Sequence, residues 1–238
     1  FACEIAMAKP DEQSGIIEVA PYIPPEGISQ GAFSSESIYW WRGYNGDGWS
    51  CDTGAEMVMQ HGILLRKNYD KLQVDLTTYS GSKAGLYGAR SPGADIDAEM
   101  KLHPVRTVAQ ANSIEEIADA LIQGRGVSSC GGEGFSSSRD DNGVSRRQGG
   151  WSHAMAIIGV DMRPSTIALY GGPLILILNS WGVWNSGPRR IRGTNIDIPN
   201  GAFWARWSDV KNRDYHVLSG AKGWAREKLD PFHLGIAI

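Results

Sequence analysis

The sequence predicts an α+β fold in which a helical half precedes a sheet half. Capped helical segments lie before residue 124, and short apolar runs follow from residue 126 onward. This separation of helices and strands is typical of α+β proteins and argues against a doubly wound sheet. The chain has 238 residues, and its 30 Gly and 11 Pro indicate many loops. Its 42% of hydrophobic residues suffice for one large domain or for two half-domains that share a cleft.

The N-terminal residues and the segment after residue 34 predict helices. Residues 1–8 have helical composition, and the run stops before Pro10, which the interior of a helix does not tolerate. The Ser-rich residues 34–37 can cap a short helix over 38–42. The Gly-rich residues 43–48 then predict a turn.

Two further helices are predicted along the chain. Asp52 or Thr53 can cap a helix that runs up to Gly62, which acts as its stop signal. Residues 72–97 have mixed composition and predict mostly loop. The pattern Ser113-Ile114-Glu115-Glu116 is a capping box, so it predicts the start of the next helix.

Apolar runs predict the strands of the sheet half. A short strand over 126–130 leads into residues 131–149, whose Gly, Ser, Arg and Asp content predicts a flexible surface loop. After this loop, four apolar runs predict strands at 153–160, 167–170, 174–178 and 202–207.

Charge and hydropathy argue against two classes of partner. The formal net charge is −3, and no Lys/Arg cluster carries interleaved aromatic residues, so we expect no nucleic-acid binding. The basic residues 189–192 predict a solvated loop. No apolar run approaches the roughly 20 residues of a transmembrane helix, so we expect no membrane partner. The chain starts with Phe and shows no signal peptide, so we expect a processed product, an excised domain or a fragment.

The three cysteines are Cys3, Cys51 and Cys130. An odd and sparse count argues against a disulfide framework. We therefore expect Cys130 to be a small buried apolar side chain, and a cytoplasmic or virion-associated location fits this count. No Cys-x-x-Cys or His-x-x-x-His pattern supports a zinc site. The oligomeric state is left open by the sequence.

Two motifs carry the candidate chemistry. Gly150-Trp151-Ser152-His153-Ala154 opens one apolar strand, and Asn179-Ser180-Trp181-Gly182 follows the apolar run 174–178. Asn179 comes 26 residues after His153 in the chain. A histidine that is oriented by an amide is a general acid and base, and a tryptophan ring shields such a hydrogen bond from water.

These motifs resemble those of papain-like cysteine peptidases. Upstream landmarks of that family are matched in order by Ser35-Glu36-Ser37-Ile38-Tyr39, Asn45-Gly46-Asp47-Gly48 and Gln60-His61-Gly62-Ile63. Gly201-Ala202-Phe203-Trp204 resembles the family's strand after the Asn-Ser-Trp-Gly motif. The likeness covers roughly residues 1–210. A departure is Val183-Trp184-Asn185, which keeps only the Trp of the family's second Trp-Gly.

The resemblance implies a fold, a domain plan and a reaction. The fold would be papain-like, with a helical half at about 1–110, an antiparallel sheet or barrel half at about 111–221, and the active-site cleft between them. All 238 residues would form this single peptidase domain, with a tail of unclear role over 222–238. The reaction would be hydrolysis of peptide bonds in a peptide or protein substrate through a thioester acyl-enzyme.

The resemblance also assigns roles to residues. His153 would be the acid and base, and Asn179 would orient it through Nδ1, with Trp181 stacked over the pair. The substrate-binding residues would be Trp181 together with Gly46, Gly48, Trp151, Ser152 and Ala154, where the glycines let the substrate backbone approach. No metal and no organic cofactor would be needed.

The nucleophilic cysteine is not located by these motifs. If Phe1-Ala2 matches the Phe-Ser that follows the family's cysteine, the nucleophile lies three residues before Phe1. Cys3 is the alternative, although no cap precedes it and the first Gln, Gln13, comes after it. The third alternative is an inactive descendant: a non-catalytic papain-fold binding or structural protein, for example one associated with a phage. Acyl transfer other than peptide hydrolysis is a further possibility on the same scaffold.

Overall fold

The computed structural model describes residues 7–11, 16–20, 34–46, 48–103, 105–191, 193–194 and 197–218, which fall into two compact units. We call the first the sheet unit; it holds the two N-terminal strands and Gln110–Val217. We call the second the helical unit; its described residues run from 34 to 109. The N-terminal strands therefore belong to the sheet unit and not to the helical half in which the sequence placed them.

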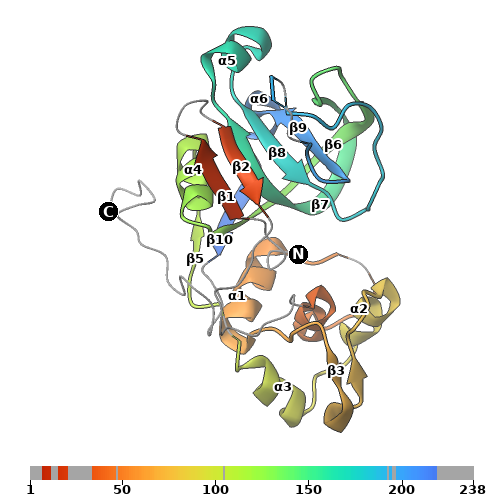
Figure 1. The fold of residues 1–238 in the computed structure, drawn as a ribbon. Coiled ribbons are helices and arrows are strands. Elements are labelled where there is room, and N and C mark those ends of the chain that lie inside the picture. Colours follow the sequence, from red (N-terminus) through yellow and green to blue (C-terminus); the bar gives the residue numbers. More distant parts are fainter. Residues whose placement is uncertain are drawn as a thin grey trace. The chain divides into compact units, whose positions relative to one another are not determined.

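The sheet unit is built on a sheet of eight strands (Figure 1). Neighbours run in the order β1-β2-β7-β6-β10-β5, while β8 pairs with β7 and β9 pairs with β8. The strands are β1 (Met7–Asp11), β2 (Ile16–Ala20), β5 (Val108–Gln110), β6 (Gly126–Arg139), β7 (Ser145–Asp161), β8 (Leu174–Leu178), β9 (Ala202–Arg206) and β10 (Asp214–Leu218).

The β1–β2 hairpin corrects the predicted N-terminal helix. Residues 1–6 lie outside the described part of the chain, but Met7 and Ala8 are in a strand that pairs antiparallel with β2. The prediction of a helix is wrong at these two residues. Pro10 cannot sit inside a helix, and β-branched residues such as Ile16 and Ile17 in the partner strand favour a sheet.

A long β6–β7 hairpin replaces the predicted flexible loop at 131–149. The two strands run antiparallel from Val127↔Ile157 to Arg139↔Ser145, with changes of register along the way. The turn is held by Asp140, whose Oδ1 accepts hydrogen bonds from the backbone N–H groups of Asn142 and Val144, both at 2.9 Å. The loop prediction is wrong because it rested on composition, whereas pairing between β6 and β7 decides the conformation here.

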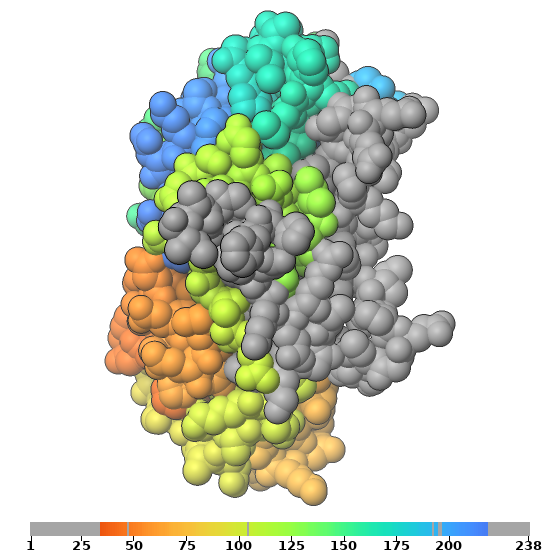
Figure 2. All heavy atoms as spheres, turned by 90° about the vertical axis from the view of Figure 1, so that its left-hand side faces the viewer, coloured from red at the N-terminus to blue at the C-terminus, as the bar shows by residue number. Residues whose placement is uncertain are grey.

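The helices of the sheet unit are α4 (Ile114–Ile122), α5 (Pro164–Tyr170) and α6 (Trp207–Val210). The predicted capping box of α4 is confirmed: Ser113 Oγ accepts from the Glu116 N–H at 3.2 Å, and the Glu116 carboxylate accepts from the Asn112 N–H at 2.6 Å. In the space-filling view, α4 and α5 lie at the surface of this unit (Figure 2).

The strand predicted over 167–170 is wrong, because these residues belong to α5. Pro164 is in the first turn of that helix, where its missing N–H costs nothing. The Asp161 carboxylate accepts from the Thr166 hydroxyl at 2.8 Å and pairs with Arg163 at 2.7 Å. Gly171 then ends the helix with φ of +74°, a left-handed conformation that suits glycine.

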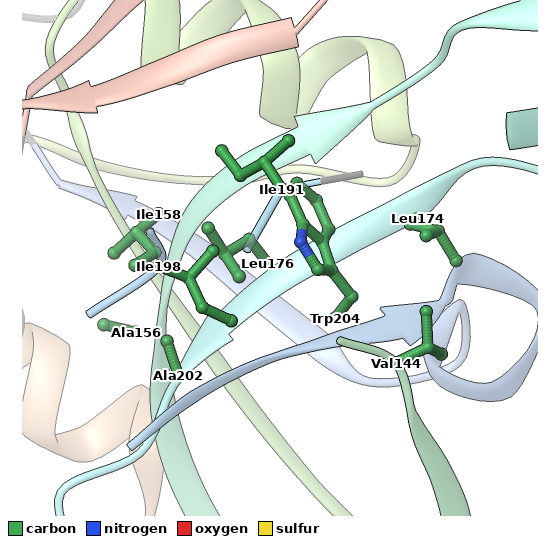
Figure 3. Close-up of a cluster of buried hydrophobic side chains, with 9 residues drawn as sticks. All are labelled: Val144, Ala156, Ile158, Leu174, Leu176, Ile191, Ile198, Ala202 and Trp204. Atoms are coloured by element: carbon green, nitrogen blue, oxygen red, sulfur yellow. The ribbon is translucent and has the colours of Figure 1, made fainter. Parts of the chain in front are cut away.

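The core of the sheet unit gathers around Trp204. Its apolar side chains come from β7, β8 and β9, from the turn before β7 and from the connection between β8 and β9 (Figure 3). They are Val144, Ala156, Ile158, Leu174, Leu176, Ile191, Ile198, Ala202 and Trp204, all buried. Burial of a large apolar side chain is worth about 1.5–3 kcal/mol, so this cluster fixes the strands from which the candidate site projects.

The helical unit contains the helices η1 (Ser35–Trp41), α1 (Cys51–His61), η2 (Asp70–Leu72), α2 (Gly81–Tyr87) and α3 (Ala94–Met100) and the paired strands β3 (Asn68–Tyr69) and β4 (Val74–Asp75). The helix predicted through Gln60 with Gly62 as its stop is confirmed as α1, but its N-cap is Ser50, so the predicted caps Asp52 and Thr53 are wrong. Gly62 has φ of +77°, and a Cβ there would clash with the Met100 carbonyl. The prediction of mostly loop over 72–97 is wrong, since it missed α2 and the start of α3.

Candidate active site

His153 and Asn179 are brought together by the register of two strands. His153 lies in β7, and Asn179 follows directly after β8. Leu178 pairs with Ala156 in this antiparallel ladder, so the next residue of β8 comes alongside the part of β7 that contains His153. Asn179 comes 26 positions after His153, and the chain between them therefore returns to the same part of the sheet.

One hydrogen bond joins the two side chains. His153 Nε2 lies 2.9 Å from Asn179 Oδ1. The amide oxygen can only accept, so Nε2 carries the proton and donates it. The predicted contact is present, but it runs through Nε2, and the prediction of Nδ1 is wrong. This arrangement leaves Nδ1 as the nitrogen that can exchange a proton with another group.

The backbone of Asn179 fixes the orientation of its own amide. The Ser180 N–H donates to Asn179 Oδ1 at 2.7 Å, so the oxygen is held in place from two sides. Asn179 is buried, and its Nδ2 has no hydrogen-bond partner among the residues that the structure describes. An orphaned amide donor is costly, because a buried unsatisfied group loses about 1–3 kcal/mol of hydration. The two hydrogen bonds accepted by Oδ1, from His153 and from the Ser180 N–H, therefore set the orientation of the Asn179 amide.

An aromatic cluster covers the pair. The Trp181 ring stacks on the His153 imidazole with centroids 4.8 Å apart and planes at 22°. Trp151 contacts Trp181 at 4.9 Å and Trp184 at 5.2 Å, and the Trp184 indole N–H donates to the Gly201 carbonyl at 2.9 Å. Trp181 is 50% exposed, so its outer surface stays open to a ligand.

The surroundings of His153 favour the neutral imidazole. Burial lowers the pKa of His153 below its ordinary value, and the nearby Arg213 guanidinium lowers it further, against the opposing hydrogen bond to Asn179. A neutral imidazole at neutral pH is what a general base requires.

The other predicted site residues fall into two groups. Ser152 and Ala154 are exposed neighbours of His153 in β7, and successive residues of a strand point to opposite faces. Their side chains therefore do not share the face on which the imidazole meets Trp181. Gly46 and Gly48 are in the helical unit, with φ of +122° and +72°, and a Cβ on either would meet nothing within 4 Å.

The described cysteines are not free thiols. Cys51, in α1, is disulfide-bonded, and the same is true of Cys130, in β6. The predicted burial of Cys130 is confirmed, but the residue is disulfide-bonded, since an odd number of cysteines still allows disulfides. The cysteine count therefore gives no support for a reducing location. Phe1 and Cys3 lie outside the described residues.

Two negative findings concern the described part of the chain only. Within it, no group of three or more His, Cys, Asp and Glu side chains could hold a metal ion. None of the helices found there has the length and apolar character needed to cross a membrane.

Two site residues have no signal in the sequence. Arg213 donates from Nη2 to the His153 carbonyl oxygen at 2.8 Å, and its Nη1 pairs with the Glu133 carboxylate at 3.0 Å. Arg213 comes 60 residues after His153, and no local pattern marks it. Glu133 falls in the segment that was predicted to be a loop.

The fold is shared with a known structure. The crystal structure of xylellain, a cysteine protease from Xylella fastidiosa, superposes on 79% of this chain and 70% of that chain with a TM-score of 0.50 and 16% identity. No protein-family model and no curated protein matches the sequence. At this identity the likeness concerns the fold: helices combined with a mainly antiparallel sheet, as in a cysteine protease.

Proposed function

We propose that this chain belongs to a papain-like cysteine peptidase that hydrolyses peptide bonds of a protein substrate. The observation that supports it best is the bond from His153 Nε2 to Asn179 Oδ1 at 2.9 Å beneath the stacked Trp181 ring. The fold shared with a cysteine protease supports the same class of reaction.

In this proposal His153 Nδ1 accepts the proton of a cysteine thiol, and the thiolate attacks the carbonyl carbon of the peptide bond. The imidazolium then gives the proton to the leaving amine as the C–N bond breaks, which leaves a thioester. His153 next removes a proton from water, and the water oxygen displaces the thiolate. Asn179 keeps Nε2 protonated and the ring in place throughout, while Trp181 shields that bond from water.

The thiol of this reaction is not among the described residues. Cys51 and Cys130 are disulfide-bonded, and Cys3 lies outside the described part of the chain. In the family order the catalytic helix precedes the helix that corresponds to η1, and residues 21–33, directly before it, contain no cysteine. The strand at Met7–Asp11 shows that the predicted helix does not extend to Met7 and Ala8.

The decisive experiment is labelling with a peptide that carries a thiol-reactive group, such as an epoxide or vinyl sulfone. The gene product that contains this chain should be labelled stoichiometrically, and His153→Ala should abolish the labelling. Asn179→Ala should slow it by about tenfold to a hundredfold, since loss of an orienting partner costs on that order. A Cys3→Ala variant assigns the label to Cys3 or to another cysteine.

A second candidate is a non-catalytic protein with the same fold, which binds peptides or has a structural role. The disulfide-bonded state of Cys51 and Cys130 favours it. In that case no cysteine reacts under native conditions, and a fluorescent peptide library should still bind, with Trp181→Ala weakening the binding. Absence of both labelling and binding would contradict both candidates.

A further inference from the structure

The strand that carries His153 changes its pairing directly beside that residue. Gly131 on β6 pairs with His153 on β7, but the next pair is Glu133 with Gly150. Two steps on β6 thus correspond to three steps on β7, which is the pattern of a β-bulge. A bulge interrupts the regular ladder, so other groups must hold the backbone in this region.

Arg213 spans this irregular region. Its Nε donates to Ser129 Oγ at 2.7 Å, its Nη1 to Glu133 Oε2 at 3.0 Å, and its Nη2 to the His153 carbonyl at 2.8 Å. The side chain is fully buried. One planar guanidinium therefore ties β6 to β7 on both sides of the bulge, which the single ammonium of a lysine cannot do.

The surrounding backbone is shaped to admit this side chain. A Cβ on Gly131 would approach Arg213 Cγ to 2.8 Å and the Glu133 carboxylate to 2.7 Å, so only glycine leaves room for the guanidinium stem. Arg213 is itself anchored, because its N–H donates to the Val210 carbonyl at 2.9 Å at the end of α6 and β10 begins at the next residue.

We propose that Arg213 is a positioning residue for His153: it fixes the His153 backbone at the bulge and so holds the imidazole on the Asn179 oxygen. This inference rests on the proposed function of His153. The charged groups around this position are Arg213, Glu133 on β6 and Asp214 on β10, while Asn179, on the β8 side, is neutral. Glu133 and Asp214 balance the guanidinium, so its charge is tolerated in a buried place.

The test compares four variants by NMR in the intact chain, with no need for peptidase activity. The imidazole Cε1–H signal of His153 is assigned by its absence in His153→Gln. In the Arg213→Gln/Glu133→Gln double variant, which removes the ion pair as a whole, the His153 titration should move, because both the guanidinium that lowers its pKa and the positioning of the Asn179 hydrogen bond that raises it are lost. Amide exchange at residues 151–154 should speed up by about tenfold or more, as expected for loss of a charge-assisted hydrogen bond.

Arg213→Lys separates charge from geometry. It keeps a positive charge near His153 but cannot reach all three partners, so it should still speed up amide exchange at residues 151–154. The matched control is Arg139→Gln. Arg139 is also buried and also lies on β6, but it bonds to Asn185, Ala202 and Gly187 instead of His153. The control should lower the unfolding midpoint without moving the His153 titration.

Two results would overturn the proposal. One is an unchanged His153 titration and unchanged exchange in the double variant; the other is an equal shift in Arg139→Gln. If the Arg213 variants do not fold, the inference can be tested on the wild-type protein. Its Arg213 guanidinium protons should exchange slowly with water and show NMR contacts to His153. Fast exchange of these protons would refute the inference. These readouts do not depend on a nucleophile, so they stand even if the labelling experiment shows no peptidase.

Discussion

Arg213 in the sheet unit and Arg42 in the helical unit are both buried guanidinium groups that hold irregular backbone, but their partners differ. Arg213 has a carboxylate, that of Glu133, beside it. Arg42 instead donates to the carbonyls of Tyr44 and Gly48 at 3.1 and 3.2 Å, and to those of Ala84 and Gly85 at 3.4 and 3.2 Å. Its guanidinium carbon also lies 4.6 Å and 4.8 Å from the ring centroids of Tyr39 and Tyr44.

The difference shows how each unit depends on its arginine. Loss of Arg213 leaves a carboxylate that is only 17% exposed without its ion-pair partner, so the damage exceeds the lost bonds. Loss of Arg42 leaves the carbonyls around the Gly-rich turn without their donor. The adjoining residues of that turn are exposed, so water can donate some of the lost hydrogen bonds. A second substitution, at Glu133, can therefore restore part of the stability lost with Arg213, whereas no single second substitution can do so for Arg42.

The largest effect is expected for Arg213→Met. Breaking a buried ion pair typically costs about 3–5 kcal/mol, and the urea midpoint of the sheet unit should fall accordingly. Adding Glu133→Gln should restore part of this loss, because the unpaired charge disappears. If the Arg213→Met/Glu133→Gln double variant is as unstable as Arg213→Met, the Glu133 carboxylate is hydrated in the single variant and its charge is not the cause of the loss.

Arg42→Met should cost less, about 1–3 kcal/mol, the range for loss of buried hydrogen bonds. The Arg42→Met variant should also be cleaved faster within residues 43–48, as measured by limited proteolysis. The matched Arg42→Lys variant keeps the positive charge over the tyrosine rings but loses the several N–H donors of the guanidinium. Its stability should therefore lie between those of the wild type and Arg42→Met. Equal behaviour of Met and Lys at this position would show that the stacked charge contributes nothing.

Helix caps give a smaller comparison between the units. Ser113 Oγ accepts from the Glu116 N–H at 3.2 Å in a complete capping box, while Ser80 Oγ accepts from the Lys83 N–H at 3.3 Å without one. Ser113→Ala should cost about 1 kcal/mol, and Ser80→Ala should cost less than that. Thermal unfolding by circular dichroism measures both, and the opposite order would contradict the role of the box.

The smallest effect is expected from pH between 7 and 5. The folded-state pKa of His153 lies below its ordinary value of 6.5, so the unfolded chain binds the proton more readily. Stability should therefore decline as pH falls through 6.5, and His153→Gln should flatten this part of the curve. In the helical unit burial raises the pKa of Glu36, but bonds from Arg66 and others outweigh it and lower the pKa, so its contribution is lost only below about 4.5.

Local chemistry in the sequence determined α1, α4, β8 and the meeting of His153 with Asn179. The capping box of α4 and the Gly62 stop signal of α1 act within a few positions, and antiparallel pairing sets His153 within β7 beside Asn179 at the end of β8. The same local patterns misread residues 167–170, where a proline start and a glycine stop outweighed an apolar run.

Only the tertiary structure decided the rest. The β6–β7 hairpin depends on pairing between Val127 and Ile157, 30 positions apart, and composition carries no information about such a partner. The sequence also does not reveal that His153 bonds Asn179 through Nε2, because this choice depends on how β7 and β8 lie against each other. Arg213, directly before β10, reaches His153 from 60 residues later in the chain, and a single arginine in a sequence does not reveal which backbone carbonyl it will meet.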